Sequence, residues 1–158
     1  MRGVAAAGLL AVALLGARAA PHRLPQRAAV YRAVIVSGSP QRTHAWAASG
    51  TAAYVAAFAH ALVARVQGPP PAPKQHAHVV FRCACPGAQF VPADQPHDGR
   101  DVKKNDDGTY TVTAADGHAV LNVTIQSATP AATYRIVATP VTEGRDRAVP
   151  VTFDLTSY

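Results

Sequence analysis

The two cysteines of the chain, Cys83 and Cys85, are separated by one alanine. Two thiols at this spacing can form a disulfide, bond to another chain, stay buried as free thiols or exchange with other disulfides. On one extended strand their side chains would share a face with Cα atoms about 6.5–7 Å apart, the upper limit for a disulfide. The pattern favours a structural bond, within the chain or between two chains, because no thioredoxin-like helix start adjoins the pair to support redox chemistry.

Two histidines, His76 and His78, precede the cysteines, and imidazole with thiolate is a common set of zinc ligands. Along one strand, successive side chains point to opposite faces. The two histidines would then face away from both cysteines, so four ligands would not converge. We therefore predict no metal site and no cofactor.

The acidic stretch 101–108 contains side chains of the kind that bind calcium. When Gly108 is aligned with the glycine of an EF-hand loop, Lys103 takes the first ligand position and Ala114 the closing one. Neither residue is a calcium ligand. A turn rich in Asp and Asn explains the composition.

A serine nucleophile with a histidine base could be assembled from Ser37 or Ser39 and His44. The chain lacks the motifs that mount such groups: a G-x-S-x-G turn, an H-E-x-x-H helix or a phosphate-binding glycine loop. We predict no catalytic residue and favour a protein that is not an enzyme.

Residues 1–19 have the form of a secretory signal peptide. Arg2 supplies the positive start, and 4–15 is an apolar run shorter than the roughly 20 residues of a membrane span. Ala17 and Ala19 are the small residues that signal peptidase requires. We expect cleavage after Ala19, an extracellular location, and no attachment to a membrane after cleavage.

Asn122-Val123-Thr124 is an acceptor sequence for N-linked glycosylation. The leader sends the chain through a secretory route, and the strand pattern described below places Asn122 on an outer face. We predict that Asn122 carries a glycan if the source is eukaryotic.

Charge narrows the class of partner. The chain has 15 Lys and Arg against 9 Asp and Glu, a formal net charge of +6. Nucleic-acid binding would call for basic residues clustered on one element with aromatic residues among them, and neither feature is present. We predict no nucleic-acid partner; an extracellular protein or an anionic cell-surface polymer is compatible with the charge.

The first half of the chain mixes clear and ambiguous elements. Residues 20–29 predict a disordered entry segment, and 30–36 a β-branched strand. The Ala-rich segment 45–67 fits a helix, because apolar residues recur every fourth position, and also fits a further strand, because they alternate. The Pro-rich stretch 68–73 predicts a surface connector.

From residue 76 onward the chain predicts strands, at 76–85, 109–115, 118–125, 133–139 and 149–155. A two-residue loop at Asp116-Gly117 would pair Ala115 with His118. The same register pairs Val112 with Leu121, and Tyr110 with Val123. The predicted core face comprises Tyr110, Val112, Ala114, Ala119, Leu121, Val123 and Ile125, and the predicted solvent face Thr109, Thr111, Thr113, Asn122 and Thr124, with Val120 an apolar residue on that side.

These elements predict a mainly β protein, a small antiparallel sandwich or barrel, in which 45–67 is either a helix or a further strand. The organisation would be a signal peptide at 1–19, an entry segment at 20–29, and one β-rich domain over 30–158 that contains the connector.

The order of elements resembles that of small secreted fungal β-sandwich proteins, effector-like or of the Alternaria major-allergen type. The resemblance rests on the leader, a first strand ending near Ser39-Pro40, the V-x-F-x-C strand at 79–83 and the D-G-T-Y-T-V-T strand at 107–113. It departs in the cysteines, because those proteins carry more of them, well separated. The resemblance implies an extracellular, non-catalytic β domain that acts on a host or on a cell wall.

The sequence thus predicts a secreted, non-catalytic protein of binding or effector type whose partner is an unknown extracellular protein or cell-surface polymer. Two alternatives stay open. One is a structural cell-surface component that assembles, as a homodimer, through an intermolecular bond of Cys83 or Cys85. The other is a small secreted hydrolase or inhibitor.

Overall fold

The structure, a computed structural model, describes residues 27–69, 77–97 and 101–158, and these residues form strands and no α-helix. The predicted signal peptide, most of the entry segment, residues 70–73 of the Pro-rich connector and His76 lie outside the described residues. The strands are β1 (Val30–Ser37), β2 (Gln41–Thr43), β3 (Ala45–Ala47), β4 (Tyr54–Ala57), β5 (Leu62–Gln67), β6 (His78–Cys83), β7 (Ala88–Val91), β8 (Val102–Lys104), β9 (Tyr110–Thr113), β10 (His118–Leu121), β11 (Thr124–Ser127), β12 (Ala132–Pro140), β13 (Arg147–Val149) and β14 (Val151–Ser157).

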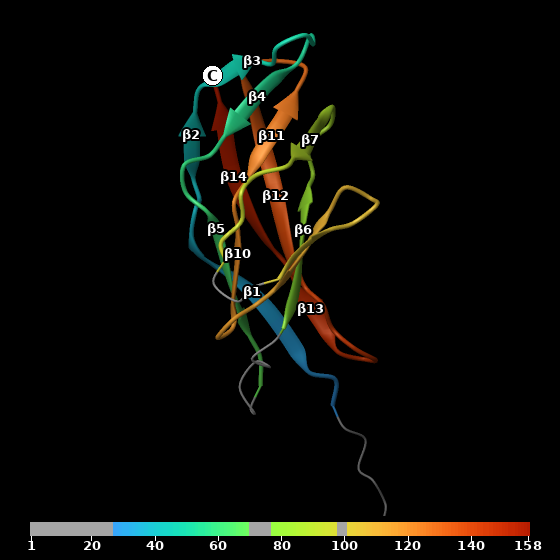
Figure 1. Ribbon diagram of the computed structural model, residues 1–158. Coiled ribbons are helices and arrows are strands. Elements are labelled where there is room, and N and C mark those ends of the chain that lie inside the picture. The colour runs from blue at the N-terminus through green and yellow to red at the C-terminus, as the bar shows by residue number, and fades with distance from the viewer. Residues whose placement is uncertain (1–26, 70–76, 98–100) are drawn as a thin grey trace, which may run out of the picture.

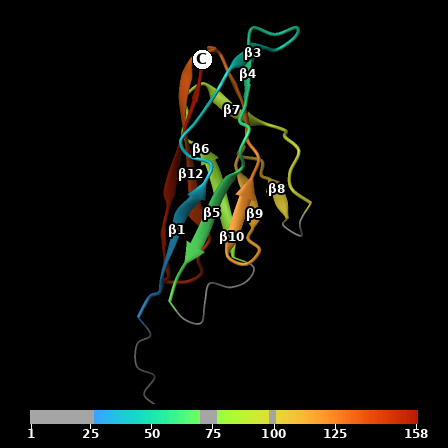
Figure 2. The same cartoon turned by 90° about the vertical axis from the view of Figure 1, so that its left-hand side faces the viewer.

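The strands form a sandwich of two layers. One layer is a six-stranded sheet with the order β2-β14-β12-β6-β9-β8. The other is divided into two four-stranded sheets, β10-β5-β1-β13 and β3-β4-β11-β7, which lie end to end because β4 leads into β5 and β10 into β11. In Figure 1, β12 and β14 run the length of the molecule, with β4 and β11 beside their upper part and β1, β5 and β10 beside their lower part; Figure 2 shows these last three side by side.

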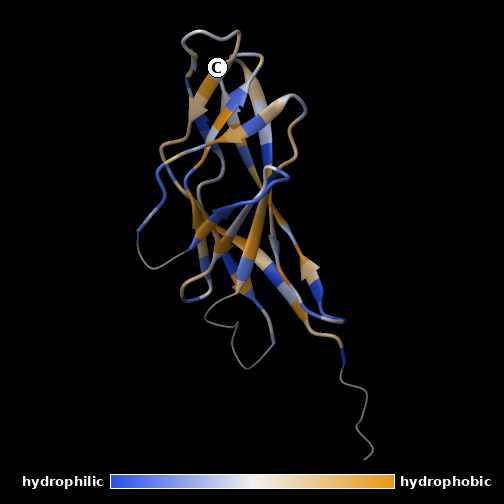
Figure 3. Ribbon diagram, turned by 45° about the vertical axis from the view of Figure 1, so that its right-hand side comes forward, coloured by the Kyte–Doolittle hydropathy of each residue, from blue (hydrophilic) through white to orange (hydrophobic). Residues whose placement is uncertain are grey.

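A single apolar core lies between the layers. Along β12 and β14, every second residue is buried, among them Tyr134, Ile136, Phe153 and Leu155. Figure 3 shows the resulting alternation of hydrophobic and hydrophilic residues along the strands. The strict two-residue period of a half-buried strand produces this pattern, and it confirms the predicted sandwich.

The ambiguous segment 45–67 forms strands β3, β4 and β5, so its helical interpretation is wrong. Its buried side chains are all at even positions: Ala56, Phe58, Leu62, Ala64 and Val66. A spacing of four is a multiple of the strand period of two, so the same apolar residues satisfied both patterns. The abundant alanine, which favours helix in isolation, was overridden by pairing with neighbouring strands.

The turn at Asp116-Gly117 is confirmed, but the predicted pairing beyond it is wrong. Both turn residues have positive φ, 49° and 75°, and Ala115 pairs with His118. After the turn β9 and β10 separate into different layers, where Val112 lies opposite Val79 and Leu121 opposite Leu62.

Each strand therefore finds its partners within its own sheet. All seven predicted core residues are buried, whereas Thr109 on the predicted solvent face is buried too.

Three predicted strands are shorter than expected, among them the one at 109–115, which is described as Tyr110–Thr113. The strand predicted at 76–85 is described from His78 and ends at Cys83, and the one at 118–125 is divided into β10 and β11 by Asn122 and Val123. The division falls where the chain passes from one four-stranded sheet to the other.

Between β1 and β2 the chain crosses from one layer to the other. Gly38 has φ 90°, and a Cβ there would overlap the carbonyl oxygen of Ala61 and approach Leu62 Cα to 2.8 Å. The buried Gln41 side chain then holds the crossing: its Nε2 donates to the carbonyls of Gly38 (2.7 Å) and His60 (2.8 Å), and its Oε1 accepts from His60 N (3.0 Å). This crossing places β2 beside β14 and β3 beside β4.

The order of the central strands has a recognisable topology. Strands β1, β5 and β10 adjoin in one layer, and β14, β12 and β6 adjoin in the other. Immunoglobulin-type sandwiches place their first, second and fifth strands together, opposite their third, sixth and seventh, in the same way. Such a topology describes the scaffold and leaves the function to be argued from the surface.

Candidate binding surface and disulfide corner

Cys83 and Cys85 form a disulfide with each other. The Cα atoms are 5.3 Å apart, closer than two residues of an extended strand would be, because the chain leaves β6 after Cys83 and enters a turn at Pro86-Gly87. Of the possibilities that the sequence left open, the structure therefore contains the intrachain bond, and no free cysteine remains. Both cysteines are half-buried.

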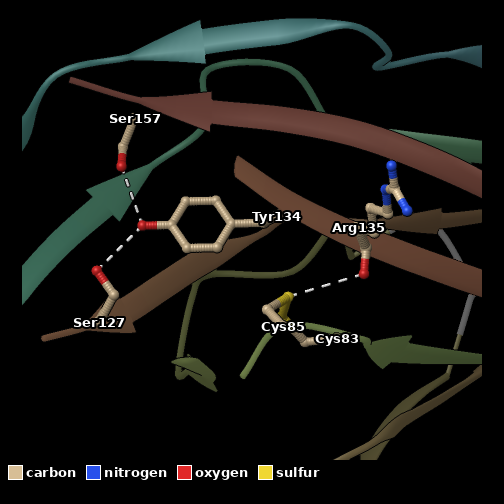
Figure 4. Close-up of a disulfide and its surroundings, with 6 residues drawn as sticks. All are labelled: Cys83, Cys85, Ser127, Tyr134, Arg135 and Ser157. Atoms are coloured by element: carbon tan, nitrogen blue, oxygen red, sulfur yellow. Dashed lines mark hydrogen bonds between the residues drawn. A yellow bond between two sulfur atoms is a disulfide. The ribbon is translucent and has the colours of Figure 1, made fainter. Parts of the chain in front are cut away.

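The disulfide corner, residues 83–87, is attached to strand β12. Ala84 N donates to the carbonyl oxygen of Arg135 at 2.8 Å, and Cys85 Sγ lies 3.7 Å from the same oxygen (Figure 4). Small hollows of about 190 and 160 Å³ flank the corner on either side. Both are smaller than the roughly 300–1,000 Å³ of small-molecule sites. A more open hollow of about 390 Å³ beside Gly87 is lined by alanine, glycine, glutamine and serine residues and contains no charged group. The corner therefore serves to hold the β6–β7 turn.

Buried polar groups near this corner are used to join the layers. The hydroxyl of Tyr134 on β12 lies 3.1 Å from Ser127 Oγ on β11 and 3.0 Å from Ser157 Oγ on β14, as Figure 4 shows. Ser127 and Ser157 donate onward to the carbonyls of Thr129 and Pro130. Among the described residues, no buried side-chain polar atom lacks a partner, so this network stabilises the fold and leaves no idle group for chemistry.

The serine and histidine side chains considered above for catalysis or metal binding also make structural contacts. Ser39 Oγ accepts from Asp154 N at 2.9 Å, and the His44 ring packs edge-on against Tyr158 with ring centroids 4.1 Å apart. His78 Nδ1 lies 3.2 Å from Thr113 Oγ1 on the neighbouring strand. Within the described ranges, no three His, Cys, Asp or Glu side chains gather as a metal site would require.

The acidic stretch is a turn held by its own side chains. Asp107 accepts hydrogen bonds from the hydroxyl (2.7 Å) and the main-chain N–H (3.0 Å) of Thr109. These bonds, the hydroxyl first, lower the pKa of Asp107 from its ordinary value. Burial raises the pKa of the neighbouring Tyr110 hydroxyl from its ordinary value.

Asn122 lies at the break between β10 and β11 and is partly exposed. Its Nδ2 donates to the carbonyl of Asp94 at 2.6 Å, and its main-chain N donates to Gln95 Oε1 at 2.9 Å. The side chain alternates with the buried Leu121 and Val123, and the Asp94 contact uses one of its two N–H groups.

One hollow of about 200 Å³ brings two carboxylates, Glu143 and Asp146, near the Tyr31 ring. Asp146 already accepts a hydrogen bond from Ala29 N at 2.9 Å. The volume is below that usual for a small-molecule site.

The clearest exposed apolar feature lies where the chain ends. Trp46 on the edge strand β3 is 51% exposed and Tyr158 is 53% exposed. Tyr158 N donates to Thr43 O and Tyr158 O accepts from Ala45 N, so the C-terminus runs along the same short stretch as β2 and β3 (Figure 1). We call His44, Trp46 and Tyr158 the aromatic end.

No pattern in the sequence marks Trp46 or Tyr158 as exposed. A lone tryptophan gave no periodic signal, and its exposure follows from β3 being the edge of its sheet.

Comparisons with known proteins assign no family: no protein-family model matches the chain, and no curated protein matches it. Over the ranges that the structure describes, no helix is long and apolar enough to cross a membrane.

Proposed function

We propose that this chain is a secreted, non-catalytic binding or effector-type protein that acts outside the cell. The apolar leader at 1–19 and the sequon at Asn122 support the secretory route. The bond between Cys83 and Cys85 is of the kind that persists in oxidising compartments. The resemblance to small secreted fungal β-sandwich proteins remains part of this proposal.

The aromatic end is the observation that carries a binding role. Exposed tryptophan and tyrosine side chains are enriched at protein interfaces, where they bury much area at little cost in conformational entropy. Here hydrogen bonds to Thr43 and Ala45 hold Tyr158, and pairing with β4 holds Trp46. The contact residues are thus held in place, Trp46 on a strand and Tyr158 directly after one, before a partner arrives, which favours affinity.

The alternatives draw less support from the molecule. A component assembled through an intermolecular bond would need a sulfur that the intrachain disulfide uses. A hydrolase or inhibitor would need convergent polar groups, and the polar groups described above are engaged in turns and strand contacts.

A cell-binding assay tests the proposal. The full chain, expressed with its leader in eukaryotic cells, should accumulate in the medium with Ala20 at its N-terminus. Fluorescently labelled protein should then bind saturably to intact cells of a panel of animal, plant and fungal lines. Trp46→Ala should reduce this binding at least tenfold.

Val141→Ala, which truncates an apolar side chain that is also 51% exposed, is the control and should leave binding unchanged. Retention of Met1 in extracellular protein, or a lack of saturable binding throughout the panel, would overturn the proposal.

A further inference from the structure

A row of cations crosses the outer face of the six-stranded sheet. Four of its strands each contribute one: Arg42 from β2, Arg135 from β12, Arg82 from β6 and Lys103 from β8. All four are exposed. Arg42, Arg82 and Arg135 each follow a buried residue on their strand, and Lys103 pairs with Thr111, which faces outward on β9. We call these four residues the cation row.

Strand register sets the spacing of the cation row. Arg42 is level with Thr133, through Thr156 of β14, and Arg135 follows two residues further along β12. Arg82 lies opposite Val137. Lys103 is level with Thr139, through Thr111 of β9 and Val80 of β6.

The four cations therefore occupy four successive outward levels of β12 while moving across the sheet. With strands about 4.8 Å apart and about 6.7 Å per two residues, neighbours in the row are about 8–12 Å apart and the row is about 30 Å long. The positive charges run diagonally across the sheet from β2 to β8.

The strands around the row are rich in hydroxyls and carry one acid. Outside the strands, Asp101 directly precedes β8, and Asp107, in the turn after β8, lines the same hollow as Arg82. Asp154 is the one carboxylate on the strands of this sheet, and it meets Arg135 at 4.0 Å with side chains 73% and 64% exposed. An exposed pair of that kind is weak and easily exchanged for another anion. The outward positions between the cations are mainly threonines: Thr111, Thr113, Thr133, Thr139, Thr152 and Thr156.

We propose that this face binds a linear sulfated polysaccharide lying along the cation row. The polymer would present regularly spaced anions to the guanidinium and ammonium groups, and hydroxyls to the threonines. Single-stranded nucleic acid fits less well, because its bases stack on aromatic side chains and this face has no Phe, Tyr or Trp at its outward strand positions. The one ring at those positions, His78, lies 3.2 Å from the hydroxyl of Thr113. The proposal rests on the proposed function only for its extracellular setting, and it concerns a second binding surface that is separate from the aromatic end.

The opposite layer supplies a matched control. Arg32, Arg65 and Arg147 project from the outer side of the β10-β5-β1-β13 sheet, where their strand neighbours are mostly valines. Removing these three arginines changes the net charge as much as removing three members of the cation row. Binding that depends only on net charge would respond equally to both changes.

The test measures binding of the purified secreted protein to heparin as the sulfated probe. Arg42→Ser, Arg82→Ser and Lys103→Ser combined should weaken binding about 10- to 100-fold, because each exposed ion contact contributes about two- to fivefold. The slope of log affinity against log salt should fall by about 2–3. The control Arg32→Ser, Arg65→Ser and Arg147→Ser should weaken binding less than about threefold, and both variants should melt within a few degrees of the unmodified protein.

Three results would overturn the proposal: no binding of heparin by the unmodified protein, equal losses in both triple variants, or tighter binding of a single-stranded DNA of equal charge. A polymer with carboxylates and no sulfates should bind more weakly than heparin, and equal binding would also contradict the proposed class. Because the assay uses purified protein, failure of secretion or of cell binding would leave its result intact.

Discussion

The outer face of the six-stranded sheet and that of the β3-β4-β11-β7 sheet are built from the same alternating strands but differ in chemistry. On the first, the residues between the members of the cation row are mainly threonines. On the second, strand register aligns Trp46, Val55, Gln126 and Gln89 in one row. No residue of its four strands is charged.

The inner faces of the two layers show no such difference. Ile125 and Leu121 of the divided layer are as fully buried as Ile136 and Leu155 of the continuous one. Alternation thus specifies a common interior and leaves the outward positions of each sheet independent. One scaffold can therefore present a charged surface on one side and an uncharged aromatic one on the other.

The largest expected effect tests the shared interior. Leu121→Ala in the divided layer and Leu155→Ala in the continuous layer should each lower the free energy of unfolding by about 2–5 kcal/mol, because each leaves a cavity in the same core. Thr111→Ala, on the outer face, should cost well under about 1 kcal/mol. Urea denaturation measures all three; equal effects of Leu121→Ala and Thr111→Ala would show that the faces are assigned wrongly.

The next effect concerns the contact between layers. Tyr134→Phe removes the hydroxyl that joins Ser127 of one layer to Ser157 of the other. Both serine protons are donated to carbonyls, so the Tyr134 proton serves one serine at a time. Its removal leaves a buried acceptor without its donor and should cost about 1–3 kcal/mol in unfolding free energy. Thr133→Ala, the exposed neighbour on the same strand, serves as the control, and a loss as large as that of Tyr134→Phe would argue against the network.

A smaller effect is expected at the disulfide corner, which belongs to the six-stranded side. A bond that closes so short a loop constrains the unfolded chain little, so Cys83→Ser with Cys85→Ser should cost about 1–2 kcal/mol. The unmodified protein should run as a monomer on a non-reducing gel. A covalent dimer that Cys85→Ser abolishes would restore the intermolecular alternative.

The smallest effect on stability is expected at the aromatic end. Trp46→Ser should change the unfolding free energy by less than about 0.5 kcal/mol, because the ring is half exposed on an edge strand. Its effect on cell binding should nevertheless be large. A melting temperature lowered by many degrees would instead make Trp46 a packing residue.

The sequence predicted the faces of the strands better than their partners. All seven core residues around the Asp116-Gly117 turn are buried, because alternation is a local property. Their partners are decided by which layer each strand joins, and no local signal marks that β9 and β10 separate.

The surface sites show the same division between local and non-local information. The spacing of Cys83 and Cys85 alone made a disulfide between them one possibility. The intrachain bond forms because the chain leaves the strand after Cys83 and brings the two Cα atoms closer together. The cation row was not predictable, because Arg42, Arg82, Lys103 and Arg135 are far apart in sequence and are aligned only by register.

The position of β14 has a consequence for the order of events during synthesis. This last strand lies inside the six-stranded sheet, between β12 and β2, and Leu155 pairs with Gln41 near the start of the domain. Since a chain emerges from its N-terminus, the sheet cannot close until residues 151–157 have been made. Any sugar attached to Asn122 during translocation would therefore meet an open, unfinished domain, before the Asp94 carbonyl has captured the amide.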